Sequence, residues 1–211
     1  MQLCYVRFLR GEPREASPCV ARLAQVARQH GLFHASVVAD MFSGWVATEA
    51  GCLEEGLHTA QKAFKILRDA KLLVNQFSTL PIICEVLKRA RLVEDAIGYI
   101  NDLLTIPRED SYESFHPELW RLKGDFLVLQ SENSDASSAE AEKCFCTAIA
   151  IAQKHEAKLY ELKAATGLCE LYKRQGRRQK AGRVLQPVLS WFAEGHETRA
   201  LKQAKNSLAS V

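Results

Sequence analysis

The amino-acid sequence predicts an all-α protein, an α-solenoid of stacked helix–turn–helix units that ends in a capping helix. Three observations predict this class: apolar residues recur at helical spacing, a turn position recurs every 40 residues, and the last helical segment is polar. Gly11, Gly51 and Arg91 define the frame, each with a small residue five positions later. Gly176 fits the same frame after two further repeats and an insertion of about five residues.

The first two units are predicted over residues 1–31 and 33–70. Gly11 is expected to end the first helix in the left-handed conformation that helix termini often adopt. Each expected helix carries an apolar stripe, so each needs a neighbour that buries this stripe. The four expected helices cover residues 1–10, 18–30, 33–50 and 53–69.

The third unit, residues 72–106, contains Pro81 within an apolar run. Because proline costs about 3 kcal/mol in a helix interior, two alternatives are open: the helix begins near Leu80, or a longer helix kinks at Pro81. The partner helix is expected over residues 93–105, and residues 107–115 form a polar connector.

The fourth unit, residues 116–155, has the clearest pattern. Its first helix carries Gly124, where the lack of a side chain allows a neighbouring helix to come close. Phe145 is central to the apolar stripe of the second helix. Ser137 and Glu140 have the spacing of a capping box, which predicts that this helix starts at Ser137 after a polar loop over residues 131–138.

The chain is expected to end with a fifth unit and a cap. The unit covers residues 157–193, with helices over 157–175 and 178–193. The cap covers residues 196–208 and has few apolar residues, as the exposed end of a repeat array requires. The prediction is a single domain over residues 1–211, interpreted as the C-terminal fragment of a larger protein.

Composition indicates a cytoplasmic protein. The net charge of +3 is too small to imply a polyanionic partner by itself. Seven scattered cysteines, an odd number, favour reduced thiols. An apolar run of membrane-spanning length and a signal-peptide pattern are both lacking, so no membrane partner is expected.

The fourth unit resembles a tetratricopeptide repeat (TPR), which has small residues at positions 8, 20 and 27 and an aromatic residue at position 24. These roles match Gly124, Ala141, Phe145 and Ala148. Gly44, Gly56 and Ala63 match in an earlier unit, and Tyr172 and Ala181 in the last. The resemblance implies a right-handed solenoid, although the 40-residue step exceeds the standard 34.

Three segments are also similar to the C-terminal repeat region of multi-domain bacterial adenylate/guanylate cyclase and ATPase signalling proteins. They are SGWVATEAGCLEEGL, PELWRLKGDFL and ELKAATGLCELYKRQGRRQKAGRVLQPVLSWFAEG. In that family, cyclase and ATPase domains precede the repeats. These 211 residues contain neither a P-loop nor a cyclase segment, so the resemblance implies a regulatory or protein-binding scaffold and no enzymatic activity.

A protein or peptide partner is expected on the concave surface that the first helices of such arrays form. By the repeat frame, this surface exposes residues of four first helices. They are Met41, Trp45, Glu85, Lys88, Arg121, Asp125, Lys173 and Arg174.

The alternative is a nucleic-acid-binding helical repeat that uses the basic turn at residues 173–183. Clustered cations of this kind can contact phosphates. However, no aromatic residue is interleaved among them, and basic residues also favour helix C-termini, so a solvated turn is the preferred interpretation.

No metal, cofactor or catalytic site is predicted. The six histidines lack the spacing of a metal site and are interpreted as surface or capping residues. Cys144 is expected in the core. Trp45, Trp120 and Trp191 could stack on a ligand, but tryptophan among apolar residues at helical spacing favours core or inter-repeat packing.

Overall fold

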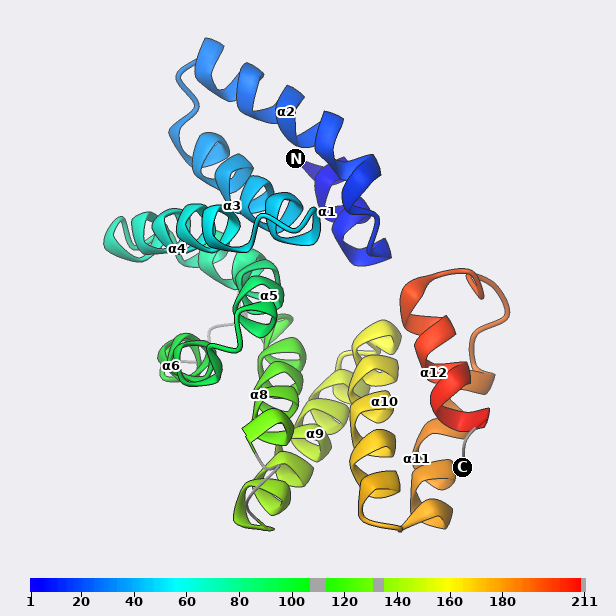
Figure 1. The fold of residues 1–211 in the computed structure, drawn as a ribbon. Helices are drawn as coiled ribbons and strands as arrows, with labels where there is room; N and C mark the ends of the chain where they lie inside the picture. The colour runs from blue at the N-terminus through cyan, green and yellow to red at the C-terminus, as the bar shows by residue number, and fades with distance from the viewer. Residues whose placement is uncertain (107–112, 131–134, 210–211) are drawn as a thin grey trace. The chain divides into compact units, whose positions relative to one another are not determined.

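The computed structural model describes residues 1–106, 113–130 and 135–209, and every regular element in these ranges is an α-helix (Figure 1). This confirms the all-α class. The chain forms two compact units, Met1–Tyr99 (unit 1) and Ile100–Val211 (unit 2). The boundary falls within one helix of the predicted third repeat. A single domain over residues 1–211 stays a prediction.

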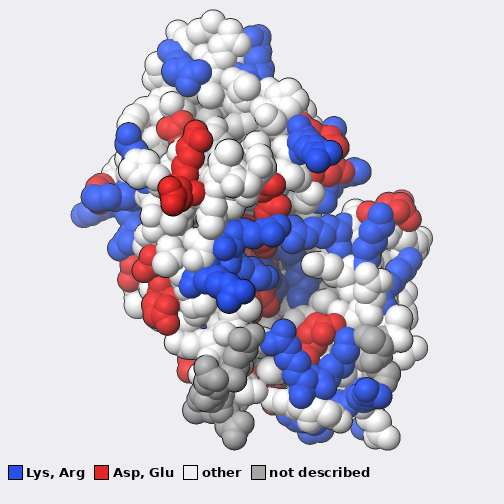
Figure 2. All heavy atoms as spheres, viewed as in Figure 1, with Lys and Arg blue, Asp and Glu red and all other residues white. Residues whose placement is uncertain are grey.

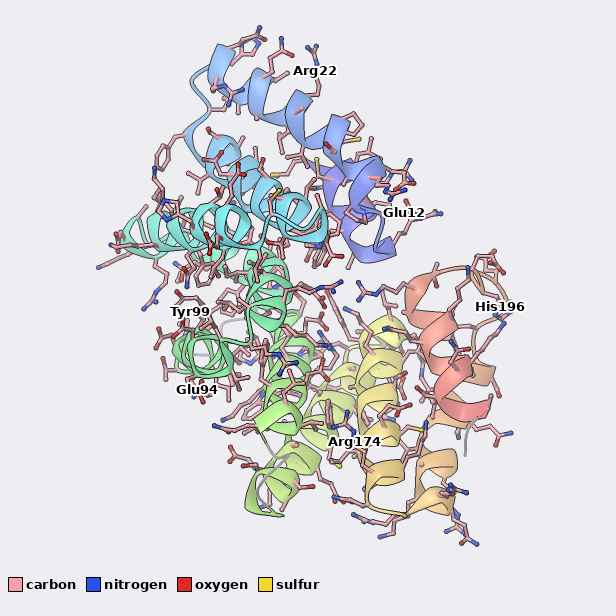
Figure 3. The ribbon with its side chains drawn as sticks, viewed as in Figure 1. Glu12, Arg22, Glu94, Tyr99, Arg174 and His196 are labelled. Atoms are coloured by element: carbon pink, nitrogen blue, oxygen red, sulfur yellow. The ribbon has the colours of Figure 1, made fainter. Side chains whose placement is uncertain are left out.

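Unit 1 consists of consecutive helices joined by short turns. Helix α3 is central, since it packs against α2, α4 and α5. Tyr99, from the last helix, lies toward α4 (Figure 3), where its ring centroid is 4.9 Å from that of Phe64 and the Arg68 guanidinium lies over it. The helices are α1 (Gln2–Arg10), α2 (Pro13–Gln29), α3 (Phe33–Glu49), α4 (Leu53–Asp69), α5 (Leu73–Arg89) and α6 (Val93–Leu104), which crosses the unit boundary.

Two helices of unit 1 that contain prolines begin earlier than a start that the sequence predicted. Helix α2 begins at Pro13 rather than at residue 18, because Pro13 occupies the first turn, where its missing N–H is not needed. Helix α5 runs through Pro81, so the alternative of a start near Leu80 is wrong. The neighbouring side chains explain this: Leu80 and Ile82 are almost fully buried, and each such burial contributes about 1.5–3 kcal/mol.

Unit 2 places α8, α10 and α12 side by side, with α9 and α11 packed between successive members. The predicted cap is confirmed as a short helix with much of its surface exposed. None of the helices in the described ranges is long and apolar enough to cross a lipid bilayer. The helices are α8 (His116–Gln130), α9 (Asp135–Lys154), α10 (Lys158–Arg174), α11 (Arg178–Ser190) and α12 (Arg199–Ala209).

Three helix boundaries in unit 2 differ from expectation by two or more residues, and one of them is the start of the cap, which lies at Arg199 rather than at residue 196. Helix α9 begins at Asp135, so Ser137 lies in its first turn, and the start at a Ser137–Glu140 capping box is wrong. The remaining residues of that expected loop, 131–134, lie outside the described residues, as do residues 107–112 of the expected connector. Helix α11 ends at Ser190 instead of 193, because the N–H groups of Trp191 and Phe192 bond to carbonyls three residues back and tighten the last turn.

The predicted repeat frame is visible in the helix ends. Gly11, Gly51 and Gly176 all have positive φ, as does Arg91 with φ of 57°, which confirms that Arg91 replaces a turn glycine. In these turns the N–H after the left-handed residue bonds to the carbonyl five residues back, as from Leu92 to Leu87 at 3.0 Å. This bond closes each helix in the same way.

Close helix packing in both units depends on glycine. Gly44 of α3 and Gly56 of α4 bring two backbones together, so that a Cβ on Gly44 would lie 2.7 Å from the Gly56 oxygen. In unit 2 the buried ring of Phe145 lies between Gly124 of α8 and Gly167 of α10. The predicted packing roles of Gly124 and Phe145 are therefore confirmed.

Candidate functional site

Two of the predicted surface residues lie in the core of unit 1. Met41 is 0% exposed, and Trp45 is 2% exposed with its ring 5.1 Å from that of Phe8. The expectation that these two side chains line an exposed surface is wrong. They belong to the apolar stripe that α3 needs to pack against its three neighbours, as the core interpretation of Trp45 proposed.

Glu85 and Lys88 both lie on α5 of unit 1. Glu85 is half-buried and Lys88 is exposed near the end of the helix. Lys88 therefore remains accessible to a partner. The other four predicted residues belong to unit 2.

Arg121 and Asp125 form part of an ion-pair network on α8. The Arg121 guanidinium donates to both carboxylate oxygens of Glu118, at 2.8 and 3.0 Å, and also to the Asp125 carboxylate. Only 12% of the Arg121 side chain is exposed. Because the guanidinium is held on two sides, it has a fixed orientation at the edge of the solvent.

Lys163 extends this network from α8 to α10. Its Nζ donates to Glu118 Oε1 at 2.6 Å. Burial raises the pKa of Glu118, but the charges of Arg121 and Lys163 outweigh it and hold this pKa at about 2. Sequence reasoning missed both Glu118 and Lys163. The three-residue spacing from Arg121 could have indicated Glu118, whereas nothing local indicates a lysine 45 residues away.

Lys173 and Arg174 lie near the end of α10. Lys173 Nζ donates to Glu170 at 2.9 Å and to the backbone oxygen of Ser207 at 3.3 Å, which links α10 to α12. Arg174 is exposed (Figure 3). We refer to these charged side chains of the adjacent helices α8 and α10 as the charged face. Its members are Glu118, Arg121, Asp125, Lys163, Lys173 and Arg174.

The charged face carries both signs of charge. In the view of Figure 2, basic side chains over unit 2 lie beside acidic ones. Four of its members are cations and two are carboxylates, and both carboxylates are paired within the face. The arrangement can therefore recognise charged groups of a partner without forming a uniformly positive surface.

The basic turn at residues 173–183 uses part of its charge internally. Arg177 donates to Glu142 of α9 at 2.7 Å and lies over the Tyr172 ring at 4.2 Å. Burial and the hydrogen bond to Glu142 raise the pKa of Tyr172 to about 12. Arg177 and Lys173 thus hold neighbouring helices together, which leaves fewer cations of this turn for a phosphate backbone.

The remaining candidate residues occupy ordinary environments or the surface. Burial raises the pKa of the Cys144 thiol to about 11, so it stays protonated in the core, as expected. The described residues contain no group of three potential metal ligands.

Trp120 is half-buried. Trp191 is 61% exposed, so its expected core position is wrong: α11 ends before it and turns its side chain to solvent.

The repeated helix pairs, common helix ends and small-residue contacts define a TPR-like repeat fold. Solved structures agree: a kinesin light chain-like protein of Podosopora anserina with nearly identical TPR-like repeats is 15% identical, with a TM-score of 0.53, and a variant of it gives 0.54. Each match covers 90% of this chain and 91% of the other. No protein-family model matches the chain, and a search of curated proteins found no significant match.

Proposed function

We propose that this chain is a non-catalytic scaffold that binds a protein or peptide partner through the charged face of unit 2. The observation that carries the proposal is the network of Glu118, Arg121 and Lys163, which fixes long charged side chains across two helices. A surface whose side chains are already ordered loses less entropy when a partner binds. Exposed Arg174 extends this surface and offers a full charge to the partner.

The wider role we propose is regulatory. The similarity of three segments to the repeat region of bacterial cyclase and ATPase signalling proteins supports a cytoplasmic segment that senses a partner for an upstream catalytic domain. The test is genomic: the reading frame that includes this chain should encode a cyclase or ATPase domain upstream. A frame without either domain contradicts this wider role and leaves the scaffold proposal intact.

The scaffold proposal is tested by partner capture followed by measurement of affinity. Cross-linked capture on the immobilised chain should identify a partner in a lysate of the source organism. Arg174→Glu should weaken binding of the purified partner about tenfold, because it reverses a charge at the interface.

Arg22→Glu is the matched control. Arg22 is an exposed arginine on α2 of unit 1, shown with Arg174 in Figure 3, and it makes a hydrogen bond only to Gln25 among the contacts described. This variant should bind within about twofold of the wild type, since its charge lies outside the charged face. Equal affinities of the two variants would contradict the assignment of the interface to unit 2.

A further inference from the structure

A second surface of unit 2 has a different chemistry. A groove of about 530 Å³ runs between α9 and α11 over the side of α10. Most of the side chains that line it are apolar, and Trp191 lies at one end. The lining includes Ile149, Ala150, Leu168, Val184, Pro187 and Val188. The charged face contributes none of its six residues to this groove, so the two surfaces are separate.

The polar side chains of the groove are largely engaged with one another. Glu161 accepts a hydrogen bond from Gln153 at 2.9 Å and another from Lys158 at 2.7 Å. The Tyr172 hydroxyl donates to Glu142. The groove therefore offers few free partners to the backbone of an extended peptide, whose N–H and C=O groups would lose water without compensation. An α-helix satisfies its own backbone and avoids this cost.

Two cations mark the ends of the groove. Lys158 lies with its Nζ 5.9 Å from the centre of the Trp191 ring, and exposed Arg183 is the first α11 residue to line the groove. Arg183 and Trp191 are eight residues apart, which corresponds to roughly 12 Å along a helix. Lys158 already pairs with Glu161, so the three charges of Lys158, Arg183 and Glu161 leave a net positive charge that Arg183 carries.

We propose that this groove binds an amphipathic α-helix of a partner protein, with the apolar stripe of that helix against α10 and Trp191. Acidic residues seven or eight positions apart on the ligand pair with Lys158 and Arg183, because Lys158 lies beside Trp191 and Trp191 lies roughly 12 Å from Arg183 along the helix axis. Trp191 covers one end of the apolar stripe. An exposed tryptophan beside an apolar groove is typical of residues that dominate binding energy.

A second copy of this chain fits less well. The exposed apolar stripe of α1, with Leu3 and Val6, is the strongest helical candidate within the chain. However, its neighbours Arg7 and Arg10 share a single acidic partner, Glu12, so this end of α1 keeps a net positive charge of the same sign as Lys158 and Arg183. This stripe also spans only nine helical residues.

The test is selection from two displayed peptide libraries on the full chain. One library has 18 residues with apolar positions at i, i+4 and i+7, and the other is identical except for a central proline, which breaks a helix. Enrichment should occur only in the helical library, and selected clones should carry Asp or Glu flanking the stripe. Equal enrichment in the proline library, or preference for Lys and Arg, would overturn the proposal.

Variants then locate the bound peptide. Trp191→Ala should weaken the best acidic clone at least about tenfold. Arg183→Glu should weaken binding of the acidic clone and strengthen binding of a version in which its acidic residues are replaced by Lys. Arg183 is changed rather than Lys158 because Lys158 also donates a hydrogen bond to Glu161. Unchanged binding in both variants would refute the groove assignment, with circular dichroism verifying that each variant is folded.

Two controls separate this proposal from its alternatives. Arg174→Glu, on the charged face, should leave peptide affinity within about twofold, so loss of this site and loss of the charged face are distinguishable. Analytical sedimentation of the chain without peptide tests whether a second copy of the chain occupies the groove. Self-association that Trp191→Ala abolishes would replace the partner helix with another copy as the occupant and refute the proposal as stated.

Discussion

The two units achieve close helix packing by different means. In unit 1, Gly44 and Gly56 bring the backbones of α3 and α4 together, and the atoms that a new side chain would meet belong mostly to backbone. In unit 2, Gly124 and Gly167 create space for the ring of Phe145. Glycine therefore allows a backbone contact in unit 1 and an aromatic contact in unit 2. Only the aromatic contact can accommodate a larger residue at the glycine position, because replacing Phe145 by a smaller side chain frees space there.

The largest expected effect is the removal of the aromatic ring in unit 2. Phe145→Ala should lower the free energy of unfolding by about 3–5 kcal/mol, because it leaves a cavity between three helices. Urea denaturation measures this change. A change near zero would mean that the ring does not fill the space between Gly124 and Gly167, and the comparison would lose its basis.

The next effect tests the backbone contact of unit 1. Gly44→Ala should cost about 3 kcal/mol, since the new Cβ would lie 2.7 Å from the Gly56 oxygen and 2.9 Å from the Ala60 nitrogen. Ala60→Gly removes a neighbouring Cβ but neither backbone atom, so the double variant should remain destabilised. Full recovery in Gly44→Ala/Ala60→Gly, measured by urea denaturation, would show that a side chain limits the approach here too.

The corresponding change in unit 2 should be milder and partly reversible. Gly167→Ala places a Cβ 2.5 Å from Cε1 of Phe145 and should cost about 2 kcal/mol. In a Phe145→Leu background, which lacks the ring edge, the same change should cost less. A double-mutant cycle measures this coupling. Strict additivity would show that the ring is not what Gly167 accommodates.

These contacts also show how far the sequence could predict the fold. Gly124 and Phe145 belong to one helix pair, so their spacing was sufficient to predict their roles. The repeat frame likewise predicts the four turns with positive φ, at Gly11, Gly51, Arg91 and Gly176. Gly167 lies on the next helix pair, and Lys163 reaches Glu118 across the same boundary. Such contacts depend on how far one helix pair is shifted relative to the next within unit 2. The apolar spacing within a single helix does not determine this shift.

The surface was harder to predict than the core for a related reason. Met41 and Trp45 occupy the same helix as other apolar residues, but α3 is covered on three sides, so its stripe is wider than the frame implied. Trp191 is instead exposed, because α11 ends one residue before it. In both cases the neighbours of a helix, rather than its own spacing, determine what is exposed.

Ion pairs between alternate helices extend the comparison. In unit 2, Glu118→Gln should cost about 1.5 kcal/mol at neutral pH, because a buried charge-assisted network loses its central carboxylate. Folding lowers the pKa of Glu118 to about 2. The contribution of this carboxylate to the free energy of unfolding is therefore fully present above its ordinary pKa of 4.5 and is lost as pH falls toward 2.

Urea denaturation at pH 7 and pH 3 tests both statements. The difference in unfolding free energy between wild type and Glu118→Gln should shrink at pH 3, where the wild-type carboxylate has lost part of its advantage. A difference that is the same at both pH values would show that the effect comes from shape or packing and not from the charge of Glu118.

The smallest effect is expected at the equivalent ion pair of unit 1. Arg89 of α5 donates to Glu49 of α3 at 2.9 and 3.1 Å, so this pair also joins alternate helices, but 59% of the Arg89 side chain is exposed. Water and salt screen such a pair, and Glu49→Gln should therefore cost less than about 1 kcal/mol. Raising the salt concentration to 1 M should remove most of this difference.

Comparison of the two glutamine variants under the same conditions isolates burial as the variable. Both wild-type pairs have good geometry and join helices that are two apart in the chain, whereas only Glu118 is almost fully buried. If Glu49→Gln proved as costly as Glu118→Gln, the geometry of the pair would outweigh its burial. The charged face of unit 2 would then have no greater rigidity than the exposed pair in unit 1, and the case for it as the preordered surface would weaken.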